Sequence, residues 1–95
     1  MPAYVIVEAD VLDEEVGLAY WRLAEPSIRR FGGRYLVASV PEAVEGAWPG
    51  RAVVLEFPDL DRIREWYDSP EYLAAREVRK SGVEVRMIFA DGVPG

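Results

Sequence analysis

The chain contains no cysteine, histidine, asparagine, glutamine or threonine. Without cysteine it can form no disulfide, thiolate nucleophile or iron–sulfur cluster. Without histidine it lacks the usual partner of a catalytic serine and the commonest transition-metal ligand. Lys80 is the single lysine, so arginine carries almost all the positive charge. The lack of thermolabile asparagine, glutamine and cysteine suits either a thermophile or a GC-rich genome.

A basic run and a long apolar run are also missing. The formal net charge is −6 at pH 7, and nucleic-acid affinity depends on phosphate neutralisation by Lys and Arg, so we expect no nucleic-acid partner. The chain contains no run of about 18 apolar residues, so the sequence predicts no membrane span. The first residues, Met1–Tyr4, lack the features of a signal peptide, so we expect a cytoplasmic protein.

The 95 residues predict one domain, residues 1–95, and the 51% hydrophobic content favours a packed fold. Three helix starts can be read directly, at Asp13, at Asp59, and at Ser69 followed by Pro70. We expect Pro26 to kink or break the first helix. The predicted elements are a strand over 3–9, a helix over 13–31, strands over 34–40 and 51–57, helical segments over 59–67 and 70–80, and a strand over 83–90. A further short strand over 43–45 is one option within the long connection 41–50.

The order β-α-β-β-α-β predicts an α+β ferredoxin-like sandwich, in which a four-stranded antiparallel sheet carries both helices on one face. The strands around 4–7 and 52–55 are apolar on both faces. Two helices cover only one face, so the other face needs a second copy packed sheet to sheet. The sequence therefore predicts a homodimer.

Four stretches, taken together and in this order, resemble the family known as domain of unknown function 1330. They are Phe31–Leu36 (FGGRYL), Glu45–Trp48 (EGAW), Arg51–Pro58 (RAVVLEFP) and Trp66–Tyr72 (WYDSPEY). The resemblance covers nearly the whole chain, although Leu73 stands where a polar residue is expected. It implies the dimeric α/β-barrel superfamily, whose members pair through their sheets. That superfamily includes cofactor-free monooxygenases, haem-handling enzymes, lactone isomerases and amino-acid-sensing domains, while the family itself has no settled activity.

Aromatic residues gather at the junction of the two helical segments, and they suit either pocket walls or core packing. Trp66 and Tyr72 are the best pocket candidates, and Trp21, Trp48 and Tyr67 are the others.

Glu8 and Glu56 are carboxylates in apolar strands. They are either general bases with raised pKa values, or they point to the sheet edge or pair with arginines such as Arg34 or Arg51 across the dimer. Arg34 could hold a substrate carboxylate or form a structural ion pair. We expect a pocket under the helix break that joins Trp66 or Tyr72 to at least one of Glu8, Arg34 and Glu56. The predicted ligand-binding residues are Glu8, Arg34, Glu56, Trp66 and Tyr72.

No catalytic residue, metal or cofactor is predicted. Ser39 and Ser69 have no histidine to activate them, and the acidic residues 10–15 suit a solvated helix start. Gly32-Gly33 is no dinucleotide fingerprint. The best-supported function is binding of a small organic molecule, acidic or aromatic, between helices and sheet. The alternatives are a cofactor-free enzyme, monooxygenase- or isomerase-like, and a purely structural dimer.

Overall fold

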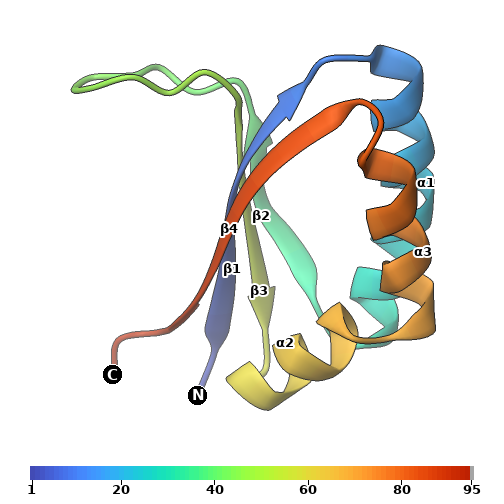
Figure 1. The fold of residues 1–95 in the computed structure, drawn as a ribbon. Coiled ribbons are helices and arrows are strands. Elements are labelled where there is room, and N and C mark those ends of the chain that lie inside the picture. Colours follow the sequence, from blue (N-terminus) through green and yellow to red (C-terminus); the bar gives the residue numbers. More distant parts are fainter. Residues whose placement is uncertain (95) are drawn as a thin grey trace.

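The computed structural model describes residues 1–94. Its elements are β1 (Ala3–Val11), α1 (Glu14–Arg30), β2 (Arg34–Ser39), β3 (Arg51–Phe57), α2 (Leu60–Tyr67), α3 (Pro70–Arg79) and β4 (Val83–Asp91). The strands form one antiparallel sheet in the order β2-β3-β1-β4. All three helices lie on one face of this sheet (Figure 1). The predicted ferredoxin-like α+β fold is confirmed.

The three predicted helix starts are confirmed, because each cap side chain accepts backbone N–H groups that the helix leaves unpaired. Asp13 accepts from Glu15 and Val16, and Asp59 accepts from Arg62. The Ser69 hydroxyl accepts from the Tyr72 amide at 3.2 Å and donates to the Trp66 carbonyl at 2.7 Å. Ser69 therefore ties the end of α2 to the start of α3.

Two local predictions need correction. The helix α1 runs unbroken past Pro26, so a break at this proline is wrong. Proline removes the hydrogen bond to the carbonyl of Arg22, and both residues lie on the exposed side of the helix, where water can replace it. No strand forms over 43–45. Residues 40–50 form a loop that extends from the sheet on the side away from the helices (Figure 1).

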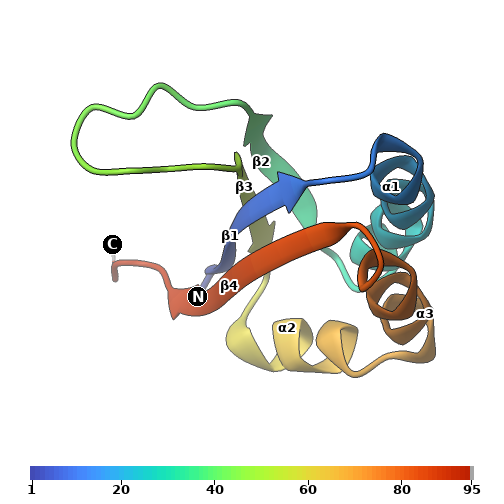
Figure 2. The same ribbon diagram turned by 45° about the horizontal axis from the view of Figure 1, so that its top comes forward.

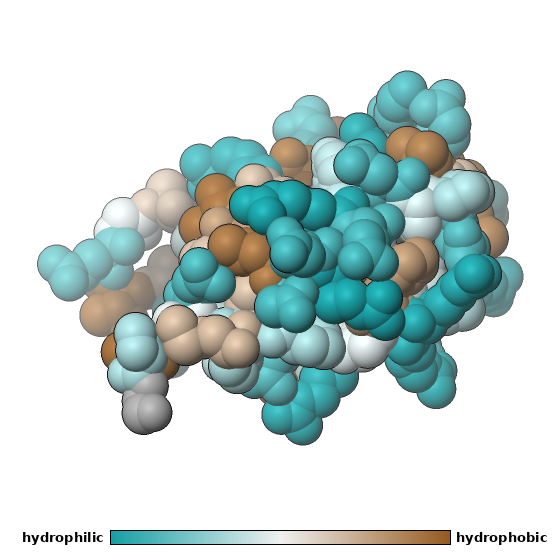
Figure 3. All heavy atoms as spheres, turned by 90° about the horizontal axis from the view of Figure 1, so that it is seen from below, coloured by the Kyte–Doolittle hydropathy of each residue, from teal (hydrophilic) through white to brown (hydrophobic). Residues whose placement is uncertain are grey.

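The core occupies the lower end of the layer between sheet and helices. The inner face of the sheet contributes Val5, Leu55 and Phe57, and α2 contributes Ile63 and Trp66, all buried. The helices α1 and α3 lie side by side in both views (Figures 1 and 2), and α2 closes the bottom of the sandwich. Seen from below, the exposed surface over α2 is largely hydrophilic (Figure 3).

No helix covers the outer face of the sheet. Ile6, Val54 and Ile88 alternate outward from three neighbouring strands, and Ile6 pairs with both others. Ile88 is 59% exposed, and Val37 on β2 is 41% exposed. Hydrophobic residues also show toward this side in Figure 3. The centre of the outer face is therefore apolar and open.

We predict that Ser69→Ala lowers the free energy of unfolding by about 1 kcal/mol, the usual cost of losing an N-cap. Ser81→Ala is the matched control, because this exposed serine makes only a 3.4 Å contact to the Val78 carbonyl. Urea unfolding of both variants measures the difference. Equal losses in the two variants would contradict a capping role for Ser69.

Candidate functional site

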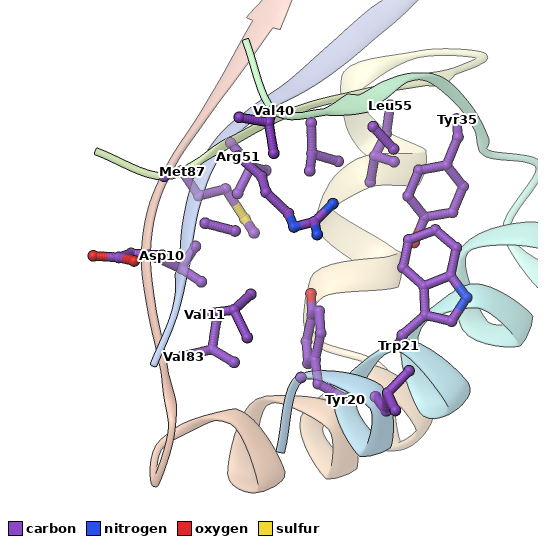
Figure 4. Close-up of a pocket in the computed structure, with 18 of the residues that line it drawn as sticks. Asp10, Val11, Tyr20, Trp21, Tyr35, Val40, Arg51, Leu55, Val83 and Met87 are labelled. Carbon is purple, nitrogen blue, oxygen red and sulfur yellow. The ribbon is translucent and has the colours of Figure 1, made fainter. Parts of the chain in front are cut away.

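A cavity of about 640 Å³ lies between α1 and the upper part of the inner sheet face (Figure 4). Apolar side chains from three strands, including Val7, Val53, Val85 and Met87, form one wall. The opposite wall is α1, where Gly17, Tyr20 and Trp21 face the cavity. The helices α1 and α3 pack against each other rather than onto the upper sheet, which leaves this space open.

Five aromatic residues are among those that line the cavity. Trp21 from α1 and Tyr35 from β2 stack with ring centroids 4.7 Å apart and planes tilted by 28°. Trp48 lines the cavity from the 40–50 loop, and Trp66 lines it from α2. All three tryptophans of the chain therefore contact one cavity. Such walls, with a few polar tips, are typical of sites for flat organic molecules.

The polar side chains that reach into the cavity are Arg51 and Tyr20, with Tyr35 beside Trp21 (Figure 4). Burial, and secondarily the neighbouring Tyr20, raise the pKa of Tyr35 above the ordinary value of 10.0. At neutral pH the Tyr35 hydroxyl is therefore protonated and can donate a hydrogen bond.

A chain of hydrogen bonds connects Tyr20 to the surface. The hydroxyls of Tyr20 and Tyr72 lie 2.7 Å apart, and the Arg79 guanidinium donates to the Tyr72 hydroxyl at 2.7 Å. Tyr72 is fully buried, and its burial, followed by the nearby Tyr20, raises its pKa. Neighbouring Trp66 donates its indole N–H to Ser27 at 3.1 Å, so its buried polar group is satisfied.

The structure divides the predicted site residues between the two faces of the sheet. Trp66 lines the cavity, and Tyr72 packs behind it with the ring centroids 4.0 Å apart. Trp66, Ser69 and Tyr72 are buried, so the helix break is filled and the cavity lies above it.

Glu8, Arg34 and Glu56 lie on the outer face, away from the cavity. The predicted pocket that joins them to Trp66 or Tyr72 is therefore wrong, because successive strand residues point to opposite faces. Arg34 pairs with Glu56 at 2.8 Å, and Tyr4 donates to Glu56 at 3.2 Å. Arg34 and Glu56 therefore form an ion pair, but within one chain rather than across the dimer as predicted.

Glu8 has a different structural role on the same outer face. It is 7% exposed, accepts from the Arg86 guanidinium at 2.6 Å, and accepts from the Gly50 amide at 3.2 Å. This second bond fixes the end of the 40–50 loop directly before Arg51. Glu8 therefore positions the chain that carries Arg51 to the cavity.

Arg51, Tyr20 and Tyr35 were not among the predicted ligand-binding residues. The alternation of β3 could have identified Arg51, since it shares a face with the core residues Leu55 and Phe57. Within residues 1–94, no cluster of metal-ligating side chains occurs. In the same range, no helix has the length and apolar character needed to cross a bilayer.

Comparison with known proteins identifies a family and a shared fold. The family model described as "Domain of unknown function (DUF1330)" matches residues 2–93. No curated protein matches the chain. The solved structure of RPA0582, a protein of unknown function from Rhodopseudomonas palustris, has a TM-score of 0.81 and 18% identity, covering 99% of this chain and 84% of its own.

Two other solved structures show the same fold. A dimeric protein of unknown function with a ferredoxin-like fold, from Bacteroides fragilis, has a TM-score of 0.60 and 18% identity, covering 96% of both chains. SnoaB, a cofactor-independent oxygenase from Streptomyces nogalater, has a TM-score of 0.67 and 9% identity, covering 99% of this chain and 95% of its own. At these identities the likeness shows the fold alone.

We predict that the free energy of unfolding falls as the pH rises above about 10, the pKa of an unfolded tyrosine. The native pKa of Tyr35 is raised, so the unfolded chain loses this proton first and gains stability relative to the native state. Each such tyrosine contributes a slope of up to about 1.4 kcal/mol per pH unit. Urea unfolding at about pH 9 and about pH 11 should show a smaller fall in Tyr35→Phe than in the wild type. An equal fall in both proteins would contradict the assignment.

Proposed function

This chain belongs to the family described as Domain of unknown function (DUF1330), and from its own geometry we propose that it binds a small, flat organic molecule in the cavity between α1 and the sheet. The cavity carries this proposal. It has a volume of about 640 Å³, within the range of roughly 300–1,000 Å³ usual for small-molecule sites. Its apolar and aromatic walls suit a planar ring system.

A purely structural role accounts less well for this cavity. Protein interiors are close-packed, and large voids lose the dispersion contacts of the groups that line them. A domain serving only assembly has no use for an open space lined by all three of its tryptophans. The binding function explains both the space and the aromatic walls.

A cofactor-free enzyme is the second candidate, supported by the cofactor-independent oxygenase SnoaB among the proteins of like fold. The protonated hydroxyl of Tyr35 could polarise a bound carbonyl group. However, Glu8 and Glu56 face away from the cavity and cannot serve there as general bases. Binding without turnover therefore remains the better-supported function, and oxygen consumption or product formation with aromatic substrates would favour the enzyme.

We also propose that the chain forms a homodimer through its outer sheet face. Ile6, Val54 and Ile88 form an apolar centre that no element of the chain covers, and the ion pairs Arg34–Glu56 and Glu8–Arg86 flank it. The Bacteroides fragilis protein of like fold is described as dimeric. A second copy packed sheet to sheet would remove this apolar surface from water.

To test the cavity, we predict that the neutral fluorescent probe N-phenyl-1-naphthylamine binds the wild type and shifts all three tryptophan indole N–H signals in NMR spectra. Ala38→Phe places a ring in the cavity and should weaken binding at least about tenfold by steric overlap. Leu73→Phe on the exposed face of α3 is the matched control and should bind normally. Probe binding that is unaffected by Ala38→Phe would refute this location.

To test the dimer, we predict that Val54→Asp dissociates it, because an unpaired charge buried in an apolar interface is strongly destabilising. Leu73→Asp adds the same charge at an exposed position on the helical side and should leave the assembly intact. Sedimentation at micromolar concentration distinguishes the species. A folded wild-type monomer of 10.7 kDa would overturn the proposed dimer.

A further inference from the structure

The polar groups of the cavity share one chemical property, and this property defines a ligand class. Resting on the proposed small-molecule function, we propose that the ligand is an aromatic carboxylate, whose anionic group is bound by Arg51 and by the hydroxyl of Tyr20, with Tyr35 as a further donor. The aromatic part of the ligand would lie against the Trp21–Tyr35 stack. The three polar groups come from β3, α1 and β2, so they approach one ligand from different walls (Figure 4).

Arg51 is a cation without a counterion in the described chain. Six of the other nine arginines form ion pairs with carboxylates, whereas Arg51, like Arg22, Arg76 and Arg79, has no carboxylate of residues 1–94 within 4.0 Å of its guanidinium. Arg51 instead extends from the start of β3 into the cavity (Figure 4). A guanidinium offers a planar fork of N–H donors that matches a carboxylate in bidentate geometry.

The direction of the hydrogen bonds among Arg79, Tyr72 and Tyr20 makes the Tyr20 hydroxyl a donor toward the cavity. Tyr72 is fully buried, and its hydroxyl accepts from Arg79. Within residues 1–94, the only acceptor within hydrogen-bond reach of the Tyr72 proton is the Tyr20 oxygen, at 2.7 Å. If Tyr20 donated instead, a buried hydroxyl proton would be left unpaired, at considerable cost. Tyr72 therefore donates to Tyr20, and the Tyr20 proton is left for an acceptor in the cavity.

Tyr35 adds a second neutral hydroxyl. Its ring is fixed by stacking on Trp21, and its hydroxyl makes no hydrogen bond to any group in residues 1–94. Tyr20 and Tyr35 line the same cavity, from α1 and β2 (Figure 4). Two neutral hydroxyls and one guanidinium together favour a ligand group that only accepts hydrogen bonds, which describes a carboxylate.

Two carboxylates of the protein also border the cavity, and neither occupies the position of the proposed anion. Asp10 points away from the cavity (Figure 4), because it lies opposite Glu84 of β4 on the outer face of the sheet. Glu14 is exposed in the first turn of α1, where it interacts favourably with the helix dipole. Neither residue neutralises Arg51.

Calorimetric titration with a matched pair of probes tests this inference. 1-Naphthoate and 1-naphthamide have nearly the same shape, and only the former carries the charge. We expect the wild type to bind 1-naphthoate at least about tenfold more tightly than 1-naphthamide. Arg51→Met should abolish this preference by weakening only the naphthoate, and Arg51→Lys should retain part of it, because charge remains without the planar fork. Arg22→Met, an exposed α1 arginine outside the cavity, is the control and should keep the full preference.

The tyrosines are tested in the same titrations. Tyr20→Phe and Tyr35→Phe should each reduce the affinity for 1-naphthoate severalfold and leave that for 1-naphthamide nearly unchanged. Equal binding of both probes by the wild type would overturn the carboxylate inference while leaving the proposed pocket intact. A loss of both probes in Arg51→Met would also overturn it, by showing that Arg51 acts through packing. Failure of both probes to bind the wild type and every variant would overturn the binding function itself.

Discussion

The packing of Trp66 is the contact on which the arrangement of the layers depends. Its ring lies against Phe57 of β3 and Tyr72 of α3, with centroids 5.3 Å and 4.0 Å away, and its indole N–H donates to Ser27 of α1. The fully buried Trp66 side chain belongs to α2 and contacts β3, α3 and α1. It therefore joins the sheet to all three helices. Aromatic residues of this size dominate core energetics, so removal of this ring would loosen every layer at once.

This anchor also explains why a cavity persists in so small a domain. Trp66 fixes the helices to the lower end of the sheet, and the contact between α1 and α3 stiffens them as a pair. Their upper ends are therefore held away from the strands, although close packing would otherwise favour collapse. The stacked Trp21 and Tyr35 connect α1 to the edge strand β2 across the gap. Packed aromatic contacts thus bound the cavity below, at Trp66, and along the β2 edge of the sheet.

The fold could be predicted from the sequence because its signals are local. The caps Asp13, Asp59 and Ser69 mark helix starts whatever the rest of the chain does, and the element order then leaves few topologies. The site depended on which face each strand residue occupies. Strands that are apolar on both faces conceal this, so the predicted pocket included Glu8, Arg34 and Glu56, which lie on the other face. Tyr20 could not be selected from sequence, because its role depends on a hydroxyl of α3 that folding brings within 2.7 Å.

The two faces of the sheet are physically connected through Gly50. No side chain fits at this position, since a Cβ would lie 2.6 Å from the Ala9 carbonyl oxygen, and its amide donates to Glu8 on the outer face. The next residue, Arg51, enters the cavity on the inner face. The bond from Gly50 to Glu8 on the outer face therefore fixes the point at which the chain enters the cavity as Arg51.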